Sequence, residues 1–260
     1  MNTEEPIKDN KDLTKKEYNS IANEYVDFKY NTYSIDIEEY TIFNILYKNW
    51  EKKDILDLAC GNGHNTEKFM KKKANSVLGM DISDEMIKLA DKTYGSPNVS
   101  FLCGDAAKLN LDKQFDIVTA FYLICFSKTR DDIAGFAKAI KKNLKPDGIF
   151  IGINNNPDSP RPPEDFIKYG IHQTTTNKGE LVEGDELNIT LYDSRGNPTG
   201  SFTDYWFPKH VIQKVFKDEG LDLKFIDPQV DPIALNKNKE FYDTFMNNKF
   251  FTGMVATHIE

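Results

Sequence analysis

The stretch "DILDLACGNGH", Asp54–His64, decides the fold. It begins as a short apolar run that one acid interrupts, and it ends in two glycines separated by a single residue. Such a run is typical of a strand buried on both faces. Glycines directly after the strand let a ligand approach the backbone, and amides at the start of a helix can bind an anion. The stretch therefore predicts a strand, a turn and a helix around a charged small molecule.

The residues that follow repeat this strand–helix rhythm. We expect helices at 65–73, from Ser83 onwards and at 130–144, and strands at 54–59, 76–80, 99–103, 115–121, 149–153, 221–226 and 251–259. Continuous apolar strands that alternate with helices are typical of a parallel sheet covered on both faces. The predicted fold is therefore α/β, a doubly wound, seven-stranded, mostly parallel sheet.

Two further segments interrupt or precede this alternation of strands and helices within a single expected domain, residues 1–260. Residues 1–14 are expected to be a frayed tail, and 15–50 show helical spacing that predicts an N-terminal helical cap. Residues 154–207 begin as a loop rich in Pro and Asn and continue with a predicted antiparallel pair. Because this insertion is too long for a plain connector, we expect it to be a lid over the substrate.

Composition and charge narrow the function classes. The net charge of -8 argues against a general nucleic-acid partner, which needs clustered Lys and Arg. The longest apolar run, at 117–126, is too short to span a bilayer, and the polar first residues do not resemble a signal peptide. The three cysteines form no CxxC pair, which favours buried free thiols in a reducing compartment, and no Cys/His spacing predicts a metal site. We expect a cytoplasmic protein without a membrane or nucleic-acid partner.

Acids stand at the strand ends, where open parallel sheets bind ligands. Asp57 precedes the two glycines, Asp81 ends the second strand and Asp105 follows the third. An acid after the second strand suits the two hydroxyls of a ribose, and one after the third strand can accept from an adenine amine. The three elements together predict a site for a nucleoside with a charged tail. A purely structural role of Asp81 and Asp105, as caps of the turns that follow, is the less favoured alternative.

The same turn distinguishes between nucleosides. The dinucleotide fingerprint GxGxxG is incomplete, because its sixth position is Thr66. Asp57 would also repel a pyrophosphate, whereas it suits a ligand that carries a cationic amine. NAD is therefore disfavoured.

At this point the motifs resemble a known family. In order and spacing, "DILDLACGNG", "VLGMDIS", "FLCGDAAKL", "FDIVTAFYLI" and "LKPDGIFI" resemble the motifs of class I S-adenosylmethionine-dependent methyltransferases over about residues 54–154. More narrowly, "YNSIANEYVDFK", "EEYTIFNIL" and "NNNP" resemble bacterial small-molecule methyltransferases of the toxoflavin-synthesis type. The resemblance implies an enzyme that transfers a methyl group from S-adenosyl-L-methionine to a nitrogen, oxygen or sulfur of a small-molecule acceptor.

The resemblance also implies roles in binding the cofactor. Gly61 and Gly63 would line the methionine tail, Asp81 would hold the ribose hydroxyls, and Asp105 would accept from the adenine amine. Tyr18 would cap the cofactor from the N-terminal segment, although a packing role explains it equally well. The full implied set is Tyr18, Tyr25, Asp57, Ala59, Gly61, Gly63, Asp81, Ile82, Met86, Asp105, Ala106 and Phe121.

Candidates for the acceptor side are aromatic residues and histidines. Tyr122, Tyr205 and Trp206 are placed to form an acceptor wall, or equally a core. Tyr122, His172 and His210 are the candidate catalytic residues, with surface or packing roles favoured for both histidines. Methyl transfer from a sulfonium needs mainly alignment, and a general base only if the acceptor must lose a proton.

Three readings of the function stay open. A small-molecule methyltransferase, acting as a monomer or homodimer, is the working hypothesis, because the chain is acidic and carries an inserted lid. An RNA or protein methyltransferase would need a basic groove beside the strand ends, and the sequence predicts none. A non-catalytic S-adenosylmethionine-binding module would bind the cofactor without turnover on any acceptor.

Overall fold

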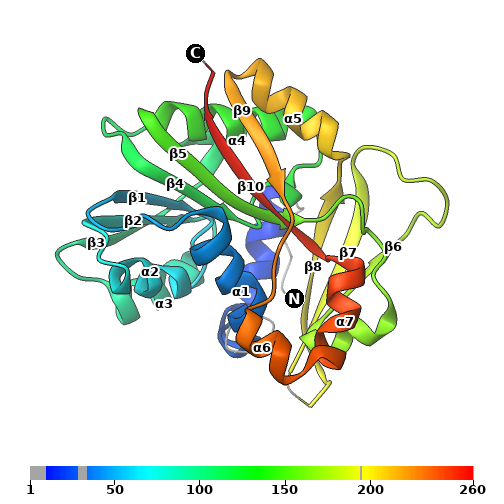
Figure 1. Ribbon diagram of the computed structural model, residues 1–260. Helices are drawn as coiled ribbons and strands as arrows, with labels where there is room; N and C mark the ends of the chain where they lie inside the picture. Colours follow the sequence, from blue (N-terminus) through cyan, green and yellow to red (C-terminus); the bar gives the residue numbers. More distant parts are fainter. Residues whose placement is uncertain (1–9, 29–33, 194, 260) are drawn as a thin grey trace, which may run out of the picture.

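A computed structural model describes residues 10–28, 34–193 and 195–259 (Figure 1). Its central sheet comprises β1 (Asp54–Leu58), β2 (Ser76–Asp81), β3 (Val99–Cys103), β4 (Phe115–Phe121), β5 (Leu144–Asn155), β9 (Leu221–Ile226) and β10 (Phe251–His258). The seven strands lie in the order β3-β2-β1-β4-β5-β10-β9. The first five are parallel to one another, and β10 runs antiparallel to β5 and β9. The predicted α/β sheet is confirmed.

Helices cover both faces of this sheet (Figure 1). They are α2 (His64–Lys71), α3 (Asp84–Tyr94), α4 (Arg130–Asn143) and α5 (Lys209–Asp218). Adjacent residues of β1 point to opposite layers: Ile55 packs in the core that contains Phe69 of α2, and Leu56 packs in the core that contains Ile140 of α4. This two-sided burial explains why the parallel strands are apolar throughout.

Side-chain caps fix the starts of two helices at the predicted residues. The Ser83 hydroxyl accepts a hydrogen bond from the Met86 amide at 3.1 Å, at the start of α3. At the start of α4, Thr129 and Asp132 satisfy each other's backbone amides in a capping box. Both caps place helix starts beside the carboxyl edge of the sheet.

The N-terminal segment contains α1 (Asn10–Phe28) and two π-helical turns, η1 (Ser34–Glu39) and η2 (Thr41–Leu46). Helix α1 begins within the stretch predicted to be a frayed tail, so that prediction is wrong for residues 10–14. The reason is tertiary: Lys11 and Lys15 form ion pairs with Asp105 and Asp84 on the body of the protein. Residues 1–9 lie outside the described residues.

The inserted segment forms a second, antiparallel sheet in the order β6-β7-β8. Its strands are β6 (Ile171–Thr175), β7 (Asp185–Tyr192) and β8 (Pro198–Trp206), preceded by η5 (Glu164–Tyr169). The β7–β8 pair was predicted, whereas β6 was not, because the buried positions of β6 include the polar Gln173 and Thr175. Helices α6 (Pro232–Lys237) and α7 (Lys239–Asn248) were also not predicted.

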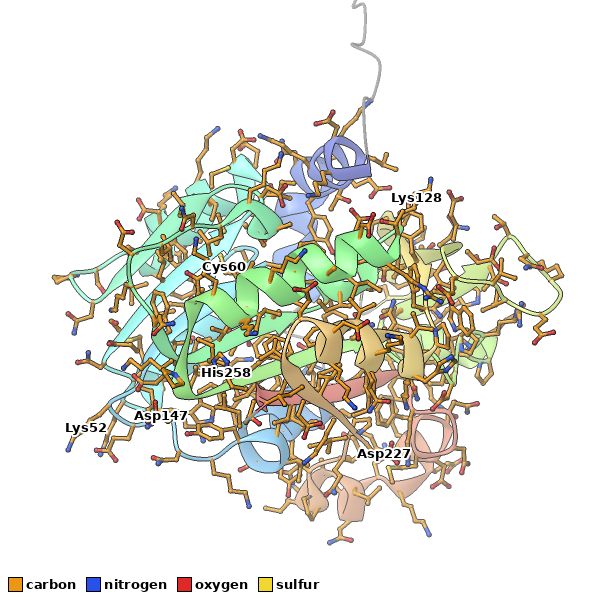
Figure 2. All side chains as sticks on the ribbon, turned by 90° about the horizontal axis from the view of Figure 1, so that it is seen from above. Lys52, Cys60, Lys128, Asp147, Asp227 and His258 are labelled. Carbon is orange, nitrogen blue, oxygen red and sulfur yellow. The ribbon has the colours of Figure 1, made fainter. Side chains whose placement is uncertain are left out.

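Labelled residues mark the two ends of the parallel strands. Seen from above, Lys52 before β1 and Asp147 near the start of β5 lie together on one side, and Lys128 after β4 lies on the opposite side (Figure 2).

Of the three cysteines, Cys60 and Cys125 are buried as predicted, but Cys103 is exposed, because β3 is an edge strand. Within the described ranges, no helix has both the length and the apolarity that crossing a membrane requires.

Candidate active site

A cleft lies at the carboxyl ends of β1 to β4. Eight of the predicted cofactor residues line it: Tyr18, Ala59, Gly61, Asp81, Ile82, Asp105, Ala106 and Phe121. The parallel topology thus brings together residues that are up to about a hundred positions apart in the chain.

The turn after β1 forms the floor of the cleft. Ala59 and Gly61 both adopt left-handed backbone conformations, with φ of 60° and 55°. For alanine this conformation costs about 1–2 kcal/mol, a strain that is often found at ligand sites. Below the turn, Asp57 is 1% exposed and accepts a hydrogen bond from the Thr119 hydroxyl at 2.6 Å, which ties β1 to β4. Asp57 does not line the cleft.

Gly63 is required for packing. It begins α2 with φ +80°, and a Cβ atom at this position would lie 2.9 Å from the ring of Tyr94 and 3.1 Å from that of Phe101. Gly63 does not line the cleft either. The two glycines of the opening motif therefore differ: Gly61 leaves room beside the ligand, and Gly63 lets α2 pack closely on its neighbours.

Asp81 presents its carboxylate at the end of β2 in a fixed orientation. One oxygen accepts from the Ser83 amide at 2.9 Å and the other accepts from the Gly61 amide at 2.8 Å. Each carboxylate oxygen has a second lone pair, so both can still accept from ligand hydroxyls. Burial raises the pKa of Asp81, and the backbone hydrogen bonds from Ser83 and Gly61 oppose this rise.

Asp105 occupies the corresponding position after β3. One oxygen accepts from the Ala107 amide at 3.0 Å, and the other receives the Lys11 ammonium at 2.7 Å. Asp81 and Asp105 therefore do cap the turns that follow, the less favoured alternative, and each also faces the cleft. The contact from Lys11 was not predicted, because nothing near Lys11 in the sequence points to Asp105.

The remaining predicted cofactor residues lie at different depths. Ile82 lines the cleft, whereas Met86 is fully buried behind it. Tyr18 lines the cleft and also packs on Phe126, with ring centroids 5.6 Å apart. The side chain of Tyr25 lies outside the described residues.

Four predicted acceptor residues lie away from this cleft. His172 is half-buried on β6, and His210 lines a shallow groove on the outside of α5. Tyr205 and Trp206 line a separate, small hollow beside Asn155 at the end of β5. Among the residues proposed for the acceptor, Tyr122 lines the main cleft.

Two buried acidic residues, Glu38 and Asp204, were not predicted. The Tyr122 hydroxyl donates to a carboxylate oxygen of Glu38 at 3.0 Å, and Glu38 is only 2% exposed. Asp204 on β8 is 1% exposed and accepts from the Asn155 amide group, and burial raises its pKa to about 7. The strand pattern of "SFTDYWF" was a signal for Asp204, because alternation places it on one face with Phe202 and Trp206.

A parallel sheet in this order, with a glycine turn after β1 and acids after β2 and β3, defines a nucleoside-binding enzyme of the methyltransferase type. A family profile described as "Methyltransferase domain" matches residues 55–148. The chain is 41% identical over 218 residues to "Putative methyltransferase 235L" of Invertebrate iridescent virus 6, covering 78% of this chain and 77% of that protein.

More distant similarities agree. A dTDP-4-amino-2,3,4,6-tetradeoxy-D-glucose N,N-dimethyltransferase of Saccharopolyspora spinosa is 26% identical, covering 68% of this chain and 74% of that protein. The structure of a DhpI–SAH complex superposes with a TM-score of 0.60 at 17% identity, covering 96% of this chain and 97% of that one. This chain belongs to the class I S-adenosylmethionine-dependent methyltransferases, and its cofactor is S-adenosylmethionine.

The chemistry of the cleft fits this cofactor. Carboxylates after β2 and β3 offer acceptors for hydroxyl and amine groups, the turn at Ala59 and Gly61 offers backbone groups, and Ile82 and Ala106 offer apolar surface. When bound, S-adenosylmethionine supplies a methyl group on a positively charged sulfur, a leaving group that needs no further activation. The protein therefore has mainly to orient the acceptor. It must also remove a proton from the acceptor atom if that atom has to lose one before it can attack the methyl group.

Proposed function

We propose that this enzyme methylates a nitrogen, oxygen or sulfur atom of a small-molecule acceptor. The observation that carries the proposal is an aromatic wall at the cleft: Tyr18 of α1 and Phe126 of η4 (Ile124–Phe126) line the cleft, and Phe202 of β8 packs against both rings. The three rings contact one another pairwise, with centroids 5.4 to 6.1 Å apart. Because α1 and β8 lie outside the parallel sheet, two separate additions to the fold close this side.

A closed aromatic wall favours a compact acceptor over a polymer, which would need an open groove. Among the described residues that line the cleft, the cationic side chain is that of Lys11, which is already paired with Asp105. A nucleic acid would require several unpaired cations beside the site. The similarity to a sugar N,N-dimethyltransferase supports the same choice.

We infer the following division of the chain and its site. Residues 1–260 act as one methyltransferase domain, with 15–50 as its N-terminal cap and 154–207 as a lid. The Thr203 amide and hydroxyl lie 3.5 and 3.4 Å from Glu17, so cap and lid contact each other. Ala59 and Gly61 receive the methionine tail, Asp81 the ribose, and Asp105 with Ala106 the adenine.

The test is turnover on defined acceptors. The purified chain is incubated with S-adenosylmethionine and panels of small amines, phenols and thiols, and S-adenosylhomocysteine formation is measured. We expect turnover on a small molecule and none on total RNA or denatured protein. Asp81→Asn should abolish it, and Glu85→Gln, an exposed change nearby, should leave it intact.

Two results would overturn the proposal. Methylation of RNA or protein, with none of any small molecule, would make this a macromolecule-modifying enzyme. Cofactor binding without turnover on any of these classes would instead support a non-catalytic binding module.

A further inference from the structure

A seam between the N-terminal cap and the lid runs along an outer strand of the second sheet. Strand β8 is that outer strand, and the Thr203 amide lies 3.5 Å from one carboxylate oxygen of Glu17 on α1. The Thr203 hydroxyl lies 3.4 Å from the other oxygen. Next to this contact, the rings of Tyr18 and Phe202 pack together with centroids 5.4 Å apart. Because Tyr18 also lines the cleft, the seam, formed by Glu17, Tyr18, Phe202, Thr203 and Asp204, closes one side of the site.

Two carboxyl groups meet at this seam, one from each element. Glu17 is half-buried, and Asp204, which directly follows Thr203, is 1% exposed. Neither carboxyl group forms an ion pair with a lysine or arginine among the described residues. Burying an ionised carboxylate without a cation is costly, and a second negative charge nearby adds to the cost. The closed seam therefore favours the state in which one of the two groups keeps its proton.

The groups packed around Asp204 compensate a negative charge poorly. From β5 the Asn155 amide donates to one of its oxygens, and from η4 the Cys125 thiol, a weak donor, lies beside it. In the strand register, β7 contributes Leu187 and β6 contributes Thr175, which are both uncharged. The charged groups in the surroundings are Glu17 and exposed Lys16 on α1, Arg161 at the Thr175 hydroxyl, and Glu186, Asp132 and Lys128 around Tyr205.

The two carboxyl groups lose their protons one after the other. Burial raises the pKa of Glu17, and hydrogen bonds from Thr203 oppose this rise. Burial raises the pKa of Asp204 to about 7, and the charge of Glu17 adds to the rise. The proton of Asp204 therefore leaves near neutral pH, when Glu17 is already charged.

We propose that the seam is a pH-sensitive gate to the cleft, closed while Asp204 holds its proton and opened when loss of that proton separates α1 from β8. Ionised Asp204 gains water and distance from Glu17 only when the seam opens, so proton loss and opening favour each other. Opening parts Tyr18 from Phe202 and exposes this side of the cleft to solvent. The gate acts in the same way for any acceptor, so it does not depend on the proposed function.

Hydrogen exchange of the full chain, followed by mass spectrometry at pH 6 and pH 8, tests the gate. Exchange rates are divided by those of an unstructured chain, so that only the protection is compared. A detached helix of 19 residues is marginal in water, so the amides of α1 exchange whenever the seam opens. At pH 8 we expect them to be at least about tenfold less protected than the amides of β1 and β4, which exchange only on global unfolding.

The pH dependence identifies the group that controls the opening. Protection of α1 should fall about tenfold from pH 6 to pH 8, the change that follows from a carboxyl pKa of about 7 in the closed seam and of about 4 in the open one. Asp204→Asn should reduce this change to less than about twofold, because the amide does not ionise.

Two further variants separate charge from packing. Glu17→Gln should weaken the change without abolishing it, because the burial of Asp204 remains. The double variant should match Asp204→Asn alone, since Glu17 acts through the charge of Asp204. Glu186→Gln, an exposed carboxyl on β7, is the control and should keep the tenfold change.

Three results would overturn the gate. Protection of α1 that is the same at pH 6 and pH 8 would show that opening is not coupled to a proton. A tenfold change that persists in Asp204→Asn, or that Glu17→Gln leaves intact, would assign the control to another group. Protection of α1 equal to that of β1 would show that the helix detaches only when the whole protein unfolds.

Discussion

Asp204 shows at the scale of a single residue how the fold changes the chemistry of one group. It is 1% exposed, and burial raises its pKa from the usual range of a carboxyl group to about 7, although hydrogen bonds from Asn155 and Cys125 oppose the rise. Below about pH 4 the carboxyl group is protonated in both the folded and the unfolded chain. Between about pH 4 and 7 only the unfolded chain releases the proton, so the free energy of unfolding falls as the pH rises through this window.

Asp204→Asn should therefore stabilise the protein at pH 8. Each pKa unit is worth about 1.4 kcal/mol, so the gain in unfolding free energy is on the order of 4 kcal/mol at most, and it should vanish at pH 4. Urea unfolding at the two pH values measures it. Glu186→Gln, an exposed carboxyl on β7, is the control and should show no such dependence. A gain of equal size at both pH values would contradict the assignment to ionisation.

Residues whose role follows from a local motif were predictable. Gly61, Asp81 and Asp105 stand at strand ends that the apolar pattern itself locates, and the structure places all three on the cleft. Lys11 and Glu38 were not predictable, because each contacts a residue more than eighty positions away. No periodicity connects such partners; only the folded arrangement does.

Among the elements, helix α1 lies against the cleft through the ion pair of Lys11 with Asp105. If Asp105 accepts from the adenine amine, Lys11 competes for the same oxygen. Lys11→Met should then lower the Kd for S-adenosylhomocysteine about two- to fivefold, since a partly exposed ion pair is worth up to about 1 kcal/mol. Calorimetry measures it, with Lys16→Met, an exposed change on the same helix, as the control. Weaker binding by Lys11→Met would show that the ammonium belongs to the site.

The end of helix α2 offers a second test at this scale. Lys73 follows the last turn with φ 63°, the left-handed position that glycine usually occupies after a helix, whereas Lys72 has φ -83°. Lys73→Gly should raise the free energy of unfolding by about 0.5–1 kcal/mol. Lys72→Gly should lower it by at least a similar amount, because it adds chain entropy and removes the contact of the Lys72 ammonium with the Phe43 ring, 5.6 Å from the ring centroid. If both variants destabilise equally in chemical denaturation, backbone strain at Lys73 is not the cause.

Elements with one dominant pattern were predicted closely, and those without one were missed. Strands β3, β4 and β9 have the expected bounds, because each is an apolar or alternating run between turns. Strand β6 was missed because buried Gln173 and Thr175 conceal its period. Helix α7 buries Tyr242 and Phe245 within a polar segment, and too few buried positions repeat for the sequence to indicate a helix.

At the scale of the whole molecule, the sheet order determines what the chain can do. Crossovers place β1 between β2 and β4, so the glycine turn lies between the acids on one side and Tyr122 on the other. The order was predictable only as a class, from the alternation of strands and helices. The aromatic wall was not, because it joins α1, η4 and β8, whose meeting depends on how the cap and the insertion pack.

The most direct test of this account is calorimetric titration of the full chain with S-adenosylhomocysteine, for the unmodified protein and for Asp81→Asn. We expect a micromolar Kd, about -8 kcal/mol in binding free energy, for the unmodified protein. Asp81→Asn should weaken binding at least about tenfold, because the amide replaces one carboxylate acceptor with a donor and removes the charge. Absence of binding by the unmodified protein, or equal binding by both, would contradict a nucleoside site at the ends of β1, β2 and β3.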